Sequence, residues 1–458
     1  MKDTLVLKFP NFMYDHREWI SDLIMNRISY NFCIEYGILD NWEISLKNDE
    51  TKRTLVLKDD FFSKASKNWL SIDSLPKLPL KKFSSDLQNI KNLPIIYGSA
   101  SHFISDKNNY YLDIDIFGSS YFMLSRYEEI VINERDGHFR FPAYKSLAKK
   151  SGFLNRPIID EYINILKKTI LFIWPNLKLK NSKFKMILSH DVDEPVRYGF
   201  RNNVRMFKAI TSDFINRRDF RSPFLAVTGK FLTKDKLNEL DPFNTFDWIM
   251  NKSESFGLKS SFYFMTNRSN KKYDCDYSIK HPAIINLLKT ISSRGHEIGL
   301  HPSYDSYNEK GLIKVEKEKL IKVLSDVGIK QKVIGGRMHF LRFEIPSTFF
   351  EWESAGFKYE SSLGYADEAG FRCGSCFEYR AFDSISGKKL NLILRPLIAM
   401  ECSVIDKRYM NFGEGEKAYN VFTSLKQSCM NVDGNFTLLW HNSRLVSDIS
   451  KELYLDIL

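Results

Sequence analysis

The sequence predicts an α/β protein in which a distorted barrel of about seven parallel strands follows a smaller α+β domain. From about residue 184 onward, apolar runs suited to strands alternate with amphipathic helical patterns, which is typical of βα-repeating domains. The 458 residues also exceed one ordinary hydrophobic core, so two domains are expected. We place the boundary near residue 180, which gives an N-terminal domain over 1–180 and the barrel over 181–458.

The composition limits the classes of partner. A formal net charge of +11 favours anionic partners such as phosphorylated sugars, and it allows peripheral association with a membrane. No zinc-finger, helix-turn-helix or RNP-like pattern accompanies the charge, so we predict no nucleic-acid partner. The N-terminal apolar run is too short for a secretory signal, and no segment reaches the about 18 apolar residues of a spanning helix. These features predict a cytoplasmic protein.

The first domain has mixed character. Segments such as "LPIIYGSA" and "YYLDIDIFGSSYFMLSRYEEI" suit a mixture of strands and helices, without the regular alternation seen later in the chain. A helical pattern, "PIIDEYINILKKTILFIW", closes this region. The basic stretch "PNLKLKNSKFK" then leads into the first strand of the barrel, so we expect the domain boundary there.

Seven runs in the second domain have the length and composition of strands. In chain order they are "FKMILS", "LKSSFYFM", "HEIGL", "VIGGRMHF", "FKYESS", "LNLILRPLIAM" and "FTLLW". Helical patterns such as "HPAIINLLKTISSRG" and "EKGLIKVEKEKLIKVLSDVG" lie between them and end in glycine. The alternation predicts a (β/α) barrel.

The six cysteines predict reduced thiols rather than a disulfide framework. They are sparse for a chain of this length, which fits a reducing compartment. Cys373 and Cys376 have the spacing of half a zinc-ribbon site, but no second pair completes four ligands. We therefore expect both to be ordinary loop cysteines.

Polar residues follow three of the predicted strands. Asp191 and Asp193 follow the first, His301 and Asp305 follow "HEIGL", and His441 follows "FTLLW". In a parallel barrel such strand ends converge on one face. Two carboxylates and an imidazole can hold a divalent ion with an open position for water, while a third carboxylate acts as base and a remote histidine as acid. We expect the remaining candidates to be capping or core histidines: His16, His102, His138, His281 and His296.

These motifs resemble those of the polysaccharide deacetylases with a NodB-type homology domain, also called carbohydrate esterase family four. "SHDVD" is similar to the first motif of that family, "RGHEIGLHPS" to the second, "GGRMHFLRF" to the third and "LLWHN" to the last. The resemblance covers about residues 184–458. The N-terminal part resembles the extension that precedes this domain in a bacterial subgroup, particularly at "DIFGSSYFMLSRYEE".

The resemblance implies roles for individual residues. Asp191 matches the general base, Asp193 a metal ligand and His301 the first metal histidine. At the position of the second metal histidine this chain has Asp305, so the third ligand is Asp305, His339 or water.

An arginine of the third motif pairs with the catalytic aspartate in the family. Arg342 is the better match and Arg337 the alternative, and either guanidinium would orient Asp191. His441 matches the general acid, a duty that the ordinary histidine pKa of about 6.5 suits.

The implied function is metal-dependent removal of an N-acetyl group from a sugar, with zinc as the expected metal. Charge and compartment favour a nucleotide- or lipid-linked sugar in cytoplasmic assembly of a bacterial surface polysaccharide. The rival interpretation is a glycan-binding protein on the same fold without turnover, which Asp305 at a ligand position would explain. A phosphohydrolase with an adjacent His–Asp pair is disfavoured because "FKMILSHD" suits a strand rather than a helix.

Overall fold

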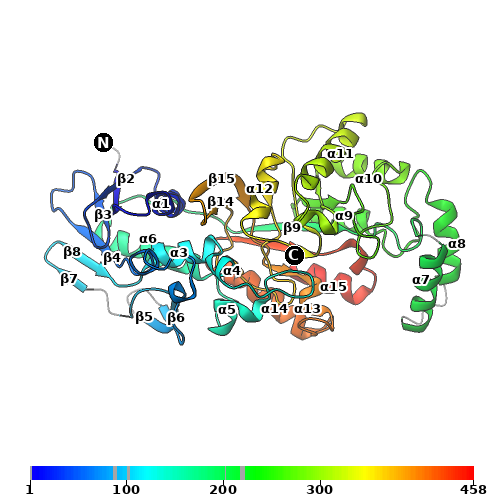
Figure 1. Ribbon diagram of the computed structural model, residues 1–458. Coiled ribbons are helices and arrows are strands. Elements are labelled where there is room, and N and C mark those ends of the chain that lie inside the picture. Colours follow the sequence, from blue (N-terminus) through cyan, green and yellow to red (C-terminus); the bar gives the residue numbers. More distant parts are fainter. Residues whose placement is uncertain (1–2, 86–89, 101–103, 202, 217–221) are drawn as a thin grey trace.

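The computed structural model describes residues 3–85, 90–100, 104–201, 203–216 and 222–458, and it is an α/β structure with two main sheets (Figure 1). The first sheet has six strands in the order β2-β1-β3-β4-β8-β7. Only β1/β2 and β4/β8 pair in parallel. The strands are β1 (Leu5–Pro10), β2 (Phe32–Gly37), β3 (Trp42–Leu46), β4 (Thr54–Leu57), β7 (Ile104–Asp106) and β8 (Asn109–Leu112), with a separate hairpin of β5 (Lys81–Ser85) and β6 (Ile90–Ile95).

Helices α1, α3 and α6 contact one another beside this first sheet. Their inner faces are apolar: in α6, for example, Ile159, Ile163, Leu166 and Ile170 recur at helical spacing and are all buried. The longer helices of this part are α1 (Tyr14–Ile28), α3 (Ile116–Leu124) and α6 (Ile158–Ile173), and two shorter ones are α2 (Phe61–Ala65) and α4 (Tyr127–Val131).

The second sheet contains eight parallel strands and one antiparallel edge strand. Its order is β14-β15-β13-β12-β11-β10-β9-β17-β16, and β14 is the antiparallel member. The strands are β9 (Lys185–Val192), β10 (Ser260–Phe264), β11 (Glu297–Leu300), β12 (Gly335–Gly336), β13 (Tyr359–Glu360), β14 (Tyr379–Asp383), β15 (Lys388–Leu394), β16 (Ala399–Met400) and β17 (Asn435–Leu439). All seven predicted runs contain strands, and β14 lies outside them.

The predicted closed ring of strands is not found in the described residues. The run "LNLILRPLIAM" forms two strands, β15 and β16, which lie at different ends of the sheet. Only the four residues 395–398 connect them, so the end of β15 and the start of β16 lie no more than about 20 Å apart. Since β15 is next to one edge of the sheet and β16 is the other edge, the sheet must curve strongly. Pro396 is in this connection and has no N–H for a ladder, which helps to explain why the strands there do not pair. The second sheet is therefore an open, curved α/β sheet.

Helices flank the second sheet, in agreement with the predicted alternation. The helix predicted at 281–295 is α10 (Pro282–Ser293), and the next is α11 (Leu312–Asp326). The others of eight or more residues are α7 (Asn203–Asn216), α8 (Ser222–Leu232), α9 (Phe246–Ser255), α12 (Ser347–Ser354), α14 (Glu416–Met430) and α15 (Asp448–Ile457). No helix in the described ranges combines the length and apolar character needed to cross a bilayer.

The two sheets are joined by one continuous hydrophobic core. Across the junction Trp19 Nε1 donates to the carbonyl of Arg380 at 3.1 Å, and Arg372 Nη2 lies 2.6 Å from Glu129 Oε2, with both charged side chains buried. A buried arginine–carboxylate pair is retained only where its hydrogen bonds are satisfied, and Arg372 makes three. The domain boundary near residue 180 stays a prediction.

Most of the other histidines are capping or packed residues, as predicted, and Cys373 and Cys376 are loop cysteines. His281 caps the N-terminus of α10 by accepting from Ala283 N, while the buried His296 and the half-buried His16 pack against aromatic rings. His138 bonds the Tyr304 hydroxyl, and His102 lies outside the described residues. Cys373 and Cys376 are buried free thiols in a loop.

Candidate metal centre and active site

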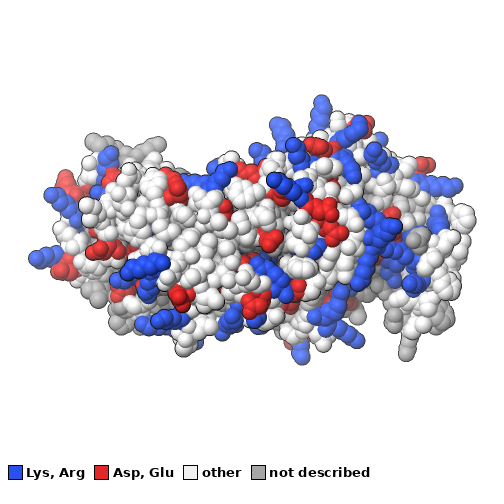
Figure 2. All heavy atoms as spheres, in the orientation of Figure 1, with Lys and Arg blue, Asp and Glu red and all other residues white. Residues whose placement is uncertain are grey.

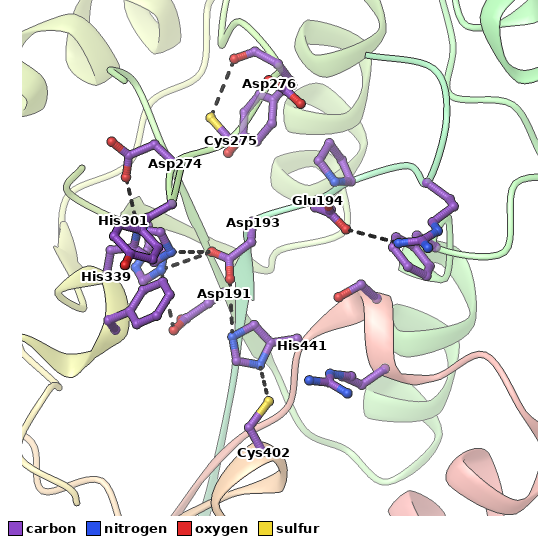
Figure 3. Close-up of a pocket in the computed structure, with 18 of the residues that line it drawn as sticks. Asp191, Asp193, Glu194, Asp274, Cys275, Asp276, His301, His339, Cys402 and His441 are labelled. Atoms are coloured by element: carbon purple, nitrogen blue, oxygen red, sulfur yellow. Dashed lines mark hydrogen bonds and ion pairs between the residues drawn. The ribbon is translucent and has the colours of Figure 1, made fainter. Parts of the chain in front are cut away.

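Polar side chains from four of five consecutive parallel strands meet at the carboxyl edge of the second sheet (Figure 3). Asp191 lies in β9 and Asp193 directly follows it, His301 follows β11, Arg337 follows β12 and His441 follows β17. Because these strands and β10, which lies between β9 and β11, all run parallel, their carboxyl ends lie on one edge.

The glycine pair of β12 allows the close approach that this edge requires. A Cβ on Gly335 would lie 2.1 Å from the Tyr359 ring, and one on Gly336 would lie 2.0 Å from the Leu300 carbonyl oxygen. Side chains at both positions would push β12 away from β11 and β13. The two glycines therefore fix where the next residue, Arg337, enters the site.

Asp193, His301 and His339 form a group with the donor set of a metal site. One ligand atom from each lies within 4.8 Å of the other two. His301 Nε2 is 3.2 Å and His339 Nε2 is 3.7 Å from Asp193 Oδ1. One carboxylate and two imidazoles, with further positions open, is a set that catalytic zinc takes and that other divalent metals also accept.

The hydrogen bonds behind the two imidazoles direct their Nε2 atoms toward Asp193. His301 Nδ1 donates to the Arg337 carbonyl oxygen at 2.6 Å, and His339 Nδ1 lies 3.0 Å from Asp274 Oδ1. A carbonyl oxygen only accepts, so the neutral His301 ring carries its hydrogen on Nδ1 and has a lone pair on Nε2. The carboxylate behind His339 has the same effect, in the arrangement usual for metal-bound histidines.

Asp193 provides the test of whether a cation fits. Its Oδ1 is buried and has no hydrogen-bond partner, although two ring nitrogens face it. Burial raises the pKa of Asp193, but His339, His301 and His441 outweigh burial and lower it well below its usual value. Burial lowers the pKa of His301, but Asp191 and Asp193 raise it above the usual histidine value. The lone pairs of the Asp193 carboxylate and of the two Nε2 atoms converge on one point, and the surrounding carboxylates favour a positive charge there. This arrangement fits a divalent ion.

Asp191 is held by Arg337 and not by Arg342. Arg337 Nη1 donates to Asp191 Oδ1 at 2.8 Å, and both side chains are buried. The other guanidinium nitrogens donate to Ser189 Oγ and to the carbonyl and hydroxyl oxygens of Ser361. The second Asp191 oxygen lies 3.8 Å from His301 Nε2, beside the candidate metal position.

Arg342 and Asp305, both expected in the site, lie elsewhere. Arg342 stacks over the rings of Tyr304 and Tyr307 at 3.8 and 3.7 Å and donates to the carbonyl oxygens of His138 and Tyr304. Asp305 lies 3.5 Å from Arg342 and accepts from Asn270, and it is not a member of the metal-ligand group. Of the alternatives that the sequence allowed, the structure thus brings His339 and Arg337 into the site.

His441 is held by a buried carboxylate. Its Nδ1 lies 2.6 Å from Glu401 Oε1, and its Nε2 lies 3.6 Å from Asp193 Oδ2. Figure 3 shows His301 and His339 on one side of Asp193 and His441 on the other. Burial lowers the pKa of His441, but Glu401 raises it well above the ordinary histidine value. Glu401 therefore favours the imidazolium form of His441.

Asp274 and Glu401 are the two site residues that the sequence analysis missed. Glu401 directly follows β16, so the same strand-end signal that selected Asp191 could have found it. The predicted strand ends at Met400, and Glu401 is the carboxylate directly after it. Asp274 is in an irregular loop between β10 and α10, where no periodic pattern places a side chain.

The site opens into a cavity of about 470 Å³ with many charged groups. This volume suits a ligand of one or two sugar rings. Seven basic side chains line the cavity against five carboxylates: Arg140, Arg197, Arg201, Arg205, Lys272, Arg408 and Arg444 against Asp191, Asp193, Glu194, Asp274 and Asp276. The cavity therefore has a net positive lining even before any metal ion is counted.

Comparisons with known proteins show a family match and two distant structural likenesses. Residues 7–175 match a family of unknown function (DUF7033), and no curated protein matches the chain. A "putative polysaccharide deacetylase from Mycobacterium smegmatis" is 15% identical with a TM-score of 0.38, and the match covers 61% of this chain and 83% of that chain. Puue allantoinase is 12% identical with a TM-score of 0.35, covering 60% of this chain and 83% of that chain. Likenesses at this level do not assign a function.

Proposed function

We propose that this protein is a metal-dependent hydrolase that removes an N-acetyl or related acyl group from a sugar. The observation that carries the proposal is the Asp193–His301–His339 group with a carboxylate and an imidazole beside it, each held by a buried partner of opposite charge. Amide hydrolysis needs a group that activates water, a base and an acid, and this edge of the sheet supplies candidates for all three.

Asp193, His301 and His339 would hold the ion, and zinc suits their donor set. A bound divalent ion supplies Lewis-acid chemistry, polarising the acyl carbonyl and lowering the pKa of a water.

Asp191 is the candidate general base. Arg337 donates to one of its oxygens, which leaves the second oxygen on the side of His301 and the cavity. The buried guanidinium fixes the plane of the carboxylate and compensates its charge. Asp191 can thus accept a proton from a water that attacks the acyl carbon.

His441 is the candidate general acid. Glu401 occupies its Nδ1, so the Nε2 hydrogen is directed toward Asp193 and the cavity. A protonated imidazole there can donate to the sugar nitrogen as the carbon–nitrogen bond breaks, and the products are a carboxylate and a free amine.

We propose a phosphate-bearing substrate, such as a nucleotide- or lipid-linked N-acetylated sugar of bacterial surface-polysaccharide assembly. The basic lining of the cavity supports this class, since guanidinium groups match phosphate oxygens in geometry and charge. The rival interpretation of a glycan-binding protein without turnover depended on Asp305 as third ligand. The grouping of His339 with Asp193 and His301 supports turnover over this rival, because it offers a second imidazole in place of Asp305.

The test is metal analysis combined with acyl release. We expect about one divalent ion for each purified chain, and acetate release from uridine diphosphate N-acetylhexosamines that exceeds release from the uncharged N-acetylhexosamines. Chelation should abolish release and added zinc should restore it. Metal-loaded protein that binds these sugars, releases no acetate and keeps its affinity after chelation would instead identify a binding protein.

We expect Glu401→Gln to move the alkaline limb of the pH profile to lower pH. His441 must be protonated to act as acid, so activity falls as pH rises through its pKa, which Glu401 raises. Without the Glu401 carboxylate the pKa of His441 decreases. The alkaline limb of the kcat/KM pH profile should then move to lower pH by about 1–3 pH units. Cys402→Ser is the matched control, because Cys402 Sγ is 4.0 Å from the same ring and carries no comparable charge. An unchanged limb in Glu401→Gln would exclude His441 as the acid.

A further inference from the structure

Helices α7 and α8 form a projecting pair at one end of the molecule (Figure 1). The fully buried residues of the pair are the small Ala209 and Ala226, which pack with Tyr198 in a cluster separate from the main core. Met206, Ile210 and Leu225 are partly buried against this cluster. Gly229 of α8 is also buried, and a Cβ there would lie 3.3 Å from the Tyr198 side chain. The pair therefore has only a small core of its own.

Most of the large apolar residues described in the pair are exposed. Seven of them are 55 to 71% exposed, and we call this set the apolar face: Val204, Phe207, Ile215, Phe224, Val227, Phe231 and Leu232. The α8 residues Phe224, Val227 and Phe231 follow the spacing i, i+3, i+7, so they form one stripe. In a water-exposed helix pair the large apolar residues are usually buried between the helices. Here alanines are fully buried between them, and phenylalanines are exposed to solvent. An exposed apolar stripe of this kind indicates a partner surface.

The segment that contains the apolar face is strongly basic. Residues 197–236 contain ten lysines and arginines against three aspartates. Lys208 and Lys230 of the helices, and Lys234 just beyond α8, are exposed beside the apolar residues. In Figure 2 the end formed by the pair is largely white, and blue side chains gather between it and the centre of the molecule. Two copies of so basic a surface would repel each other, whereas an acidic lipid surface would attract it.

The same segment also borders the candidate active site. Arg197, Phe200 and Arg201 line the cavity just before α7, and Arg205 lines it from the first turns of α7. A surface that binds to the apolar face would therefore lie close to the mouth of the cavity.

We propose that the apolar face inserts into the head-group region of an anionic lipid bilayer. Amphipathic helices that lie in the membrane interface combine exposed aromatic and aliphatic residues with flanking lysines and arginines, and each basic residue near an acidic surface strengthens binding. Docking brings the cavity to the bilayer. If the hydrolase proposal holds, the docked enzyme acts on a sugar linked to a membrane lipid, and this step alone depends on that proposal.

The experiment is co-sedimentation of the full chain with vesicles. Vesicles of phosphatidylcholine with phosphatidylglycerol are compared with phosphatidylcholine alone, at low and high salt. The test variant is Phe207→Ser/Phe224→Ser/Phe231→Ser. The matched control, Tyr36→Ser/Ile38→Ser/Phe172→Ser, changes exposed apolar residues of the N-terminal part. We expect wild type and control to bind the acidic vesicles, the test variant to bind at least about 10-fold more weakly, and salt to weaken binding.

Three outcomes would overturn membrane docking: no binding of wild type to acidic vesicles, equal binding by the test variant, or a dimer in analytical ultracentrifugation that only the test variant abolishes. The last outcome would assign the apolar face to a second copy. Thermal unfolding monitored by circular dichroism checks that the test variant folds. Vesicle binding needs no turnover, and the test variant should hydrolyse a soluble substrate as wild type does, so failure of the hydrolase proposal would remain distinguishable.

Discussion

We expect His339→Ala to lower divalent-metal affinity and acyl release by more than about 100-fold, and Asp305→Ala to leave the metal bound. His339 contributes one of three ligand atoms grouped within 4.8 Å. Loss of a hydrogen-bond partner behind a metal-binding histidine already costs about 10- to 100-fold, so loss of the ligand itself should cost more. Asp305 lies outside the group and contacts Arg342 and Asn270.

The measurement is metal titration by calorimetry, with acetate release followed on the same samples. Asp305→Ala is a suitable control because it removes a partly exposed polar side chain from the same region that lies outside the ligand group. The ligand assignment would be refuted if Asp305→Ala lost the metal, or if His339→Ala kept it with unchanged affinity.

Much of the site could be predicted because its residues stand at strand ends. An apolar run fixes where a parallel strand lies, and the residue after it is then placed at the common edge within about one position. This rule found Asp191, Asp193, His301 and His441. It depends only on local pattern and on the parallel order of the sheet, and both can be inferred from one sequence.

The third motif shows where that rule fails. "VIGGRMHF" suggested a strand up to about residue 340, but β12 contains only Gly335 and Gly336. The strand end is set by neighbours distant in sequence, since the Tyr359 ring and the Leu300 carbonyl occupy the space of any side chain at the glycines. Arg337 is thus the residue at the edge.

The position of His339 depends on the turn that follows β12. The 3-10 turn His339–Leu341 contains Phe340 at a φ of 60°, a left-handed conformation that a non-glycine side chain seldom adopts. No local sequence signal predicts such a residue at phenylalanine. The turn places His339 against Asp274, and this contact between two irregular segments could not be inferred from periodicity.

Arg337→Met should destabilise the fold by about 3–5 kcal/mol and lower activity strongly, because it leaves the buried Asp191 carboxylate without its cation. The substitution also removes the donors to Ser189 and Ser361, which tie β9 to the segment after β13. If Asp191 is the base, misplacing it should reduce kcat by about 10²–10⁴-fold at a temperature where the variant is still folded.

Arg342→Met is the matched control, since both arginines are buried in the same motif. It removes the stacking on Tyr304 and Tyr307 and two hydrogen bonds to carbonyl oxygens, for which we expect about 1–3 kcal/mol. Asp191 keeps its partner in this variant, so kcat should change far less. Urea unfolding measures the change in the free energy of unfolding, and acetate release from the metal-loaded variants measures kcat. A larger loss of kcat in Arg342→Met than in Arg337→Met would mean that Arg337 serves mainly to compensate a buried charge and that the catalytic carboxylate is not Asp191.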